Sequence, residues 1–178
     1  MTHTLLVLMQ DRPGALQRTI TLFRRRAFNL HSVAVGPSEL PGVSRMTVVV
    51  EAGDVEQVVK QLYNVIEVLK VTDLTDEPAV HREVALVKIH VPPGTRAEAV
   101  ALAGVFGAKV LDVGARSMVL EITGYPSKVE SFIDVLRPFG IKEMVRSGRI
   151  AMLRGAQLRA APAGVRERDE HEAVAAAG

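Results

Sequence analysis

Hydrophobic and polar residues alternate along this chain with two periods, which divide it into short strands and amphipathic helices. Apolar residues at every second position, or in short unbroken runs, predict strands, whereas a spacing of three or four predicts helices. Leu16, Ile20, Phe23 and Ala27 show the helical spacing. Within residues 1–76 the predicted order is strand 4–9, helix 14–27, strand 30–35, strand 43–51, helix 55–64 and strand 65–74.

The second half of the chain repeats this order. Strands are predicted at 85–91, around 110, at 118–122 and at 141–145, with helices at 96–106 and 128–136. A further apolar segment at 149–153 can add an edge strand. The repeat predicts an α+β fold of two tandem ferredoxin-like βαββαβ sandwiches, each with two helices on one face of a four-stranded antiparallel sheet.

This pattern also sets the expected domain boundaries. We expect one domain at residues 1–76, a linker at 77–83 and a second domain at 84–154. Residues 155–178 are rich in Ala, Gly and charge and show no apolar period, so we expect this tail to be disordered.

The starts of the predicted helices differ in one informative way. Three of them carry a pattern typical of a capping box, in which a side chain three residues after the cap reaches back to it. These patterns are Asp54-x-x-Gln57, Thr95-x-x-Glu98 and Ser127-x-x-Glu130. The first helix has Gly14 at the corresponding position, which leaves backbone N–H groups uncovered and suited to a small anion. The structural alternative is that Asp11 caps its own helix.

The predicted strand at 30–35 lies at a sheet edge in this topology. It contains no Pro, and its only ionisable side chain is His31, which is charged when it is protonated. An unprotected apolar edge promotes aggregation unless another strand pairs with it. Pairing with a second copy of the chain would remove that hazard, and it would bring Asn29 and the Gly14 turn of two subunits toward a shared interface.

Composition narrows the function classes. The chain of 178 residues has 48% hydrophobic residues, no Cys, no Trp, 4% aromatic residues and a formal net charge of +2. Few aromatics and a small net charge argue against a nucleic-acid partner. No apolar run approaches the roughly 20 residues of a membrane span, so we expect no membrane association. The absence of Cys fits a cytoplasmic location.

Catalytic and metal motifs are equally sparse. The five His residues show no H-x-x-H or H-E-x-x-H spacing, which argues against a metal site. One enzyme class with a ferredoxin-like fold, the acylphosphatases, needs an Arg in the first loop and an Asn near a strand end. Arg12 and Asn29 satisfy that requirement only superficially.

Several stretches of the chain resemble one known family. Residues 11–16, followed by Phe23-x-x-Arg26-x-Phe28-Asn29, resemble the amino-acid-binding ACT domain. The stretches 29–37, 44–47, 85–89 and 146–155 are similar to the small regulatory subunits of acetohydroxyacid synthase, also called acetolactate synthase. The resemblance covers residues 1–155.

The resemblance implies a non-catalytic role. A small subunit of this family activates a large catalytic subunit and confers feedback inhibition by valine or another branched-chain amino acid, with leucine and isoleucine as further candidates. Thiamine diphosphate, FAD and magnesium would belong to the large subunit, and no cofactor is expected in this chain. The alternative is a free-standing ACT-domain amino-acid sensor for a different enzyme or regulator.

The resemblance also implies where the effector binds, at the interface of an ACT-domain homodimer. Main-chain N–H groups of residues 12–16 would bind the ligand carboxylate, Asn29 would add polar contacts and Asp11 would meet the ammonium group. His31 departs from the family, which commonly has Glu there. The implied effector-binding residues are Asp11, Arg12, Pro13, Gly14, Ala15, Leu16, Asn29, Leu30 and His31.

Overall fold

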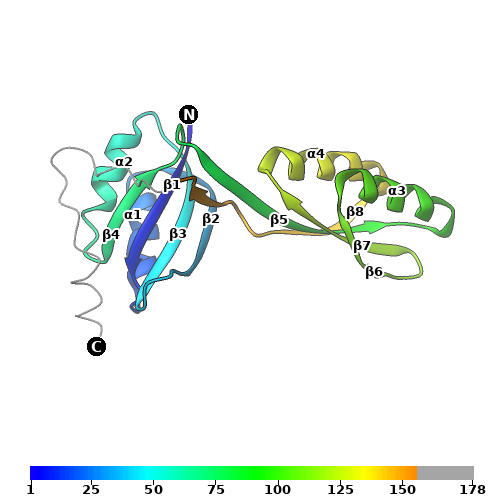
Figure 1. Cartoon of the computed structure of the whole chain (residues 1–178), viewed down its shortest axis with the longest axis horizontal. Coiled ribbons are helices and arrows are strands. Elements are labelled where there is room, and N and C mark those ends of the chain that lie inside the picture. Colours follow the sequence, from blue (N-terminus) through cyan, green and yellow to red (C-terminus); the bar gives the residue numbers. More distant parts are fainter. Residues whose placement is uncertain (156–178) are drawn as a thin grey trace. The chain divides into compact units, whose positions relative to one another are not determined.

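The computed structural model describes residues 1–155, which form two compact units (Figure 1). Among the described residues, the first unit comprises residues 1–80 together with residues 151–155, and the second comprises residues 81–150. The tail expected to be disordered lies, apart from Gly155, outside the described residues. No helix among the described residues is long and apolar enough to cross a membrane.

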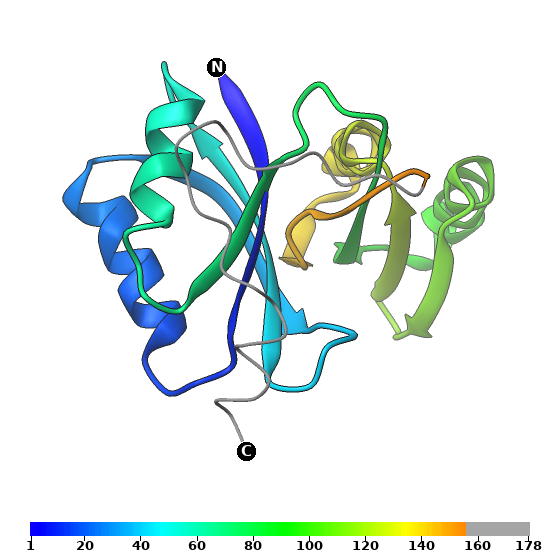
Figure 2. The same cartoon turned by 60° about the vertical axis from the view of Figure 1, so that its left-hand side comes forward.

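The first unit is a ferredoxin-like sandwich. Its elements are β1 (Thr2–Gln10), α1 (Ala15–Arg25), β2 (Asn29–Pro37), β3 (Val43–Glu51), α2 (Val55–Leu62) and β4 (Val68–Asp73). The strands form an antiparallel sheet in the order β2-β3-β1-β4, so β2 lies at an edge as predicted. Both helices cover the same face of this sheet (Figure 2).

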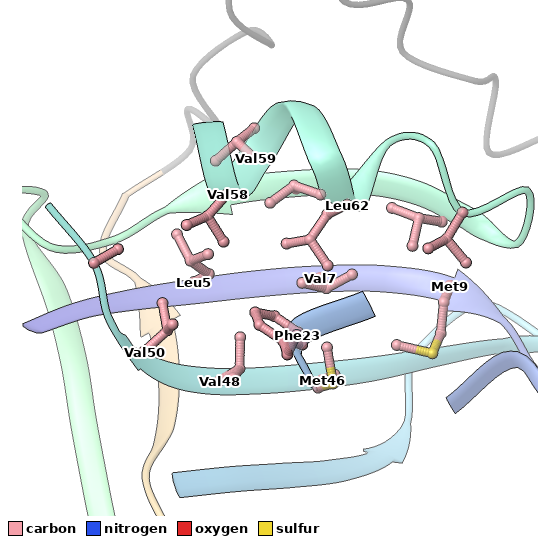
Figure 3. Close-up of a cluster of buried hydrophobic side chains, with 14 of the residues drawn as sticks. Leu5, Val7, Met9, Phe23, Met46, Val48, Val50, Val58, Val59 and Leu62 are labelled. Carbon is pink, nitrogen blue, oxygen red and sulfur yellow. The ribbon is translucent and has the colours of Figure 1, made fainter. Parts of the chain in front are cut away.

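The core of this unit lies between the sheet and its two helices (Figure 3). Alternate residues of β1 and β3 point inward, as a period of two requires, and they meet Phe23 of α1. The predicted inward face of α1 is wrong at both ends, because Leu16 is 42% exposed and Ala27 is exposed. The helix instead buries Ala15, Thr19 and Phe23.

Thr19 fits this buried face because its hydroxyl has a local acceptor. The Oγ1 atom donates to the carbonyl of Ala15 at 3.0 Å, so this buried hydroxyl is satisfied. Ala27 lies beyond the helix end with a φ of 55°.

The second unit repeats the sandwich. Its elements are β5 (Ala79–His90), the short 3-10 helix η1 (Pro93–Thr95), α3 (Arg96–Phe106), β6 (Lys109–Val113), β7 (Ser117–Gly124), α4 (Pro126–Leu136), η2 (Arg137–Phe139) and β8 (Ile141–Arg146). The strand order is β6-β7-β5-β8, and the apolar side chains of α3 and α4 pack on one face of the sheet. The predicted fold class is therefore confirmed for both halves.

The boundaries between the two halves differ from the expected ones. Strand β5 begins at Ala79, inside the stretch 77–83 that was expected to be a linker. The segment predicted to add a strand forms β9 (Ile150–Leu153), which pairs with β5. Its residue Ala151 packs against Leu6 and Leu74 of the first unit. The chain thus returns to its first unit after completing the second.

Only one of the three predicted capping patterns forms a cap. The Asp54 side chain accepts a hydrogen bond from the Gln57 N–H at 3.3 Å, which caps α2. Thr95 makes no cap, because a 3-10 turn precedes α3 and the Thr95 hydroxyl donates to the carbonyl of Pro92 at 3.3 Å. Helix α4 begins at Pro126, so the third pattern lies inside the helix.

Candidate functional site

The turn between β1 and α1 is the first part of the candidate site. Gly14 is the N-cap of α1 and has a φ of 86°, a left-handed conformation that favours Gly over other residues. No side chain in the described part of the chain caps the helix, so the structural alternative in which Asp11 caps it is wrong. The Asp11 N–H instead donates to the carbonyl of Gly42, at 2.8 Å, in the loop between β2 and β3.

The backbone donors of this turn are only partly used. The N–H of Arg12 donates to the carbonyl of Gln10 at 3.0 Å, and the N–H of Ala15 donates to the carbonyl of Arg12 at 3.1 Å. Within residues 1–155 the N–H groups of Gly14, Leu16 and Gln17 have no hydrogen-bond acceptor. Unpaired N–H groups in the first turn carry partial positive charge, so this turn can bind a small anion such as a carboxylate.

A cation held by a buried carboxylate adjoins the turn. Arg18 donates from Nε and Nη2 to the two carboxylate oxygens of Glu67, the Nε bond being 3.0 Å long. The Glu67 side chain is only 8% exposed. Its pKa lies below the ordinary value because of the Arg18 hydrogen bond, which outweighs the opposing effect of burial. A Cβ atom added to Gly14 would lie 2.9 Å from Arg18 Nη1.

Neither Arg18 nor Glu67 was among the predicted site residues. The one feature of the sequence that could have indicated this pair is the acidic Glu67, which lies within the otherwise apolar stretch 65–69. Its partner is 49 positions away, so sequence spacing alone does not connect the two.

The start of β2 is the second part of the candidate site. Asn29 Nδ2 lies 3.4 Å from Glu51 Oε2, and His31 Nε2 lies 3.3 Å from the same oxygen. Leu30 packs against the core. The Asn29 hydrogen bond, followed by the interactions of His31, lowers the pKa of Glu51. Glu51 is thus a further polar residue of this part that sequence reasoning missed.

These two parts lie at opposite ends of the same sheet. Gln10, just before the turn, pairs with Val43 at the start of β3, whereas Asn29 pairs with Glu51 at its end. At the usual rise per residue, β3 spans about 26 Å between those positions. One chain therefore does not bring Asn29, Leu30 and His31 together with the Gly14 turn.

The predicted turn residues themselves lie close together and differ in exposure. Asp11, Arg12, Pro13 and Leu16 are exposed, Gly14 is half-buried and Ala15 is buried. The exposed side chains beside the N–H groups of Gly14, Leu16 and Gln17 leave the turn accessible to a ligand. In the described part of the chain, no three His, Asp or Glu side chains are grouped so that they could hold a metal ion.

Two successive ferredoxin-like sandwiches, the first with an uncapped glycine turn after β1, define this chain as a pair of ACT-type domains. Comparison with family models agrees. Residues 5–70 match the acetohydroxyacid synthase small subunit-like ACT domain, and residues 82–155 match the small subunit of acetolactate synthase.

Individual relatives support the same assignment. The chain is 48% identical over 157 residues to a probable acetolactate synthase small subunit of Archaeoglobus fulgidus, with 87% of this chain and 98% of the relative covered. It is 45% identical over 156 residues to the acetolactate synthase small subunit of Mycobacterium bovis, covering 86% and 93%. The crystal structure of the acetolactate synthase small subunit from Thermotoga maritima superposes with a TM-score of 0.81 at 38% identity, covering 88% of this chain and 99% of that one. The chain belongs to the acetolactate synthase small-subunit family.

Proposed function

We propose that this chain is the regulatory subunit of an acetolactate synthase. In this proposal it binds a large catalytic subunit, raises the activity of that subunit and makes it sensitive to a branched-chain amino acid, valine foremost, with leucine and isoleucine as further candidates. Thiamine diphosphate, FAD and magnesium belong to the large subunit, and this chain supplies regulation only. The observation that carries the proposal is the uncapped turn at Gly14 in a chain of this family.

The chemistry of the turn suits the carboxylate of an amino acid. Unpaired N–H groups of Gly14, Leu16 and Gln17 would donate hydrogen bonds to it, and the positive charge of Arg18 lies beside them. A zwitterion also needs its ammonium group hydrogen-bonded, since an unpaired charge removed from water costs too much. Asp11 is one candidate for that contact. For so few ligand atoms we expect a binding free energy of about 4 to 8 kcal/mol.

We further propose that two copies complete the site through β2. In an antiparallel pairing of two β2 strands, the Asn29 end of one copy lies opposite the Pro37 end of the other. The Pro37 end leads into the loop whose Gly42 carbonyl accepts from Asp11. Such a pairing would therefore carry Asn29 and Glu51 of one copy toward the Gly14 turn of the other, which a single chain cannot do.

A calorimetric titration tests ligand binding. Valine is titrated into the purified full chain, with leucine, isoleucine and an unrelated amino acid alongside. The informative variant is Gly14→Asp, which places a carboxylate where the ligand carboxylate would bind. Gly14→Asn is its matched control, because it has the same size and the same tolerance of a left-handed φ without the charge.

Each outcome has a distinct meaning. We expect saturable valine binding that Gly14→Asp weakens at least about tenfold more than Gly14→Asn. Equal binding by wild type and Gly14→Asp would show that the turn is not the effector site. Activity of the large subunit with and without this chain tests the partner. Valine binding without any activation would identify a free-standing amino-acid sensor instead.

A further inference from the structure

A groove between α1 and the end of α2 carries a concentration of positive charge, of which the proposed effector site uses only Arg18. Its volume is about 690 Å³, and it is bordered by α1 and by the segment at the end of α2. Arg18, Arg25 and Arg26 line it from the side of α1, and Gln61 and Asn64 line it from the other. None of the described residues that line it is acidic.

The arginines of the groove share one side of the helix. Residues at i, i+4 and i+7 fall on one face, so Arg18, Leu22 and Arg25 lie in a row. Arg26, which follows directly as the C-cap, lines the same groove. Arg24 has the same charge and belongs to the last turn of the helix, but it does not line the groove.

Two of these charges have no carboxylate partner among residues 1–155. Arg18 is paired with Glu67, whereas Arg25 and Arg26 form no ion pair with any residue of the described part of the chain. Helix α1 itself contains no Asp or Glu. Arginines at a helix C-terminus interact favourably with its dipole, which accounts for Arg24 and Arg25 as helix residues. The dipole of α1 does not explain why several Arg residues line one groove while none of the described lining residues carries a carboxylate.

We propose that this groove binds an acidic segment of the large catalytic subunit. The inference rests on the proposed function, which requires such a partner, and it names the surface and the chemistry of the contact. Guanidinium groups form directional, charge-assisted hydrogen bonds with carboxylates, and complementary charge speeds and orients association. The groove also presents apolar side chains, including Leu22 and Val65, beside the arginines. Its occupant is therefore a segment that carries carboxylates next to an apolar residue.

The groove adjoins the proposed effector turn through Arg18. The Arg18 guanidinium lines the groove, and its Nη1 atom lies 2.9 Å from the position of a Cβ on Gly14. An effector carboxylate at the turn and a partner carboxylate in the groove would both lie near this one cation. The arrangement gives effector binding a direct physical route to the partner contact.

The test is the affinity of the full chain for its large subunit, measured by calorimetry at low and at high salt. The informative variant carries Arg25→Glu and Arg26→Glu, and the control carries Arg24→Glu, which reverses one charge in the last turn of the same helix but outside the groove. We expect the double variant to lose at least about tenfold in affinity and to lose most of its salt dependence, and the control to stay within about twofold. Valine titration of each variant checks that the first unit remains folded.

If the wild-type chain binds the large subunit, three results would overturn the proposal. Equal affinities of the double variant and the control would show that the groove does not contact the large subunit. Dissociation of a homodimer by the double variant alone would assign the groove to a second copy of this chain. A difference between the two variants that disappears when residues 156–178 are removed would assign it to the chain's own C-terminal end. If the wild-type chain itself does not bind the large subunit, the proposed function fails and this inference fails with it.

Discussion

Arg45 of β3 donates a hydrogen bond from Nη2 to the carbonyl oxygen of Ala151 at 3.1 Å, across 106 positions of sequence. Ala151 belongs to β9, the segment that returns to the first unit after the second unit is complete. Its side chain packs against Leu6 and Leu74. Since the N–H of Arg154 also donates to the carbonyl of Pro78 at 2.8 Å, both polar and apolar contacts hold the closing segment in place.

The first prediction concerns this hydrogen bond. Arg45→Met keeps most of the aliphatic stem and removes the donor, so the Ala151 carbonyl loses its partner. We expect the free energy of unfolding of the first unit to fall by about 1 kcal/mol. Urea unfolding checks the value, and hydrogen exchange at Leu6 and Leu74 checks its location. Arg24→Met is the control, and a loss of the same size in that variant would show that the effect comes from charge alone.

The repeated fold could be predicted from sequence because it depends on local periods. Alternation in strands such as β1 and helical spacing around Phe23 are visible within a few residues of each position. The predicted inward face of α1 comprised apolar residues alone and therefore omitted Thr19, which is buried. Its hydroxyl is satisfied inside the helix by the Ala15 carbonyl, which a hydrophobicity pattern does not show.

The candidate site could be predicted only where a single residue determines the geometry. A left-handed turn favours Gly, and Gly14 stood out in the sequence because it occupies the position where the other predicted helix starts carry Gln or Glu. Pairs of residues that are distant in sequence could not be recognised in this way. Glu130, which was assigned to a capping box, accepts instead from Arg146 Nη1 at 2.7 Å. Long-range partners of this kind also account for the omission of Arg18 and Glu67.

The second prediction is a pH dependence that arises from Glu67. Its pKa is lower in the folded chain than the ordinary value of 4.5, so the folded state binds this proton less readily than the unfolded state. The stability that Glu67 contributes is therefore present above pH 4.5 and is lost as the pH falls through the lowered pKa. We expect Glu67→Gln to lower the free energy of unfolding at neutral pH by about 1 to 3 kcal/mol and to flatten its decline in acid.

Chemical denaturation at a series of pH values measures this effect. Glu56→Gln is the control, because Glu56 and its partner Lys60 are both exposed and contribute little. Identical pH profiles for wild type and Glu67→Gln would show that the Arg18 pair does not stabilise the fold.

The third prediction tests whether β2 is the dimer edge. Val35 of β2 is 42% exposed, and Val113 of β6, an edge strand of the second sheet, is 49% exposed. A Lys on a paired edge places like charges from two copies near each other. We expect Val35→Lys to raise the dimer dissociation constant at least about tenfold and to weaken valine binding with it, whereas Val113→Lys changes neither.

Sedimentation equilibrium over a range of protein concentrations gives the dissociation constant for each variant. The comparison is balanced because both changes replace an exposed Val on an edge strand with the same cation. If Val113→Lys dissociates the dimer and Val35→Lys does not, the dimer contact lies on the second sheet. A wild-type chain that stays monomeric would show that the effector site is not shared between two copies.

The fourth prediction concerns the ion cluster of the second unit. Arg146 of β8 donates to both carboxylate oxygens of Glu83, at 2.7 and 2.9 Å, and to Glu130. The Glu83 side chain is only 6% exposed, and these hydrogen bonds raise the pKa of Arg146. Removing Arg146 leaves a buried carboxylate without its cation, so we expect Arg146→Met to destabilise the second unit by about 3 kcal/mol.

A second substitution separates this cause from lost packing. Adding Glu83→Gln removes the buried charge, so we expect the double variant to recover part of the stability lost in Arg146→Met. Arg137→Met is the control, since the Arg137–Asp134 pair is exposed on both sides and should cost less than about 1 kcal/mol. If the double variant is no more stable than Arg146→Met, the buried charge of Glu83 is not the cause of the lost stability. The Arg146 side chain would then stabilise this unit through its packing.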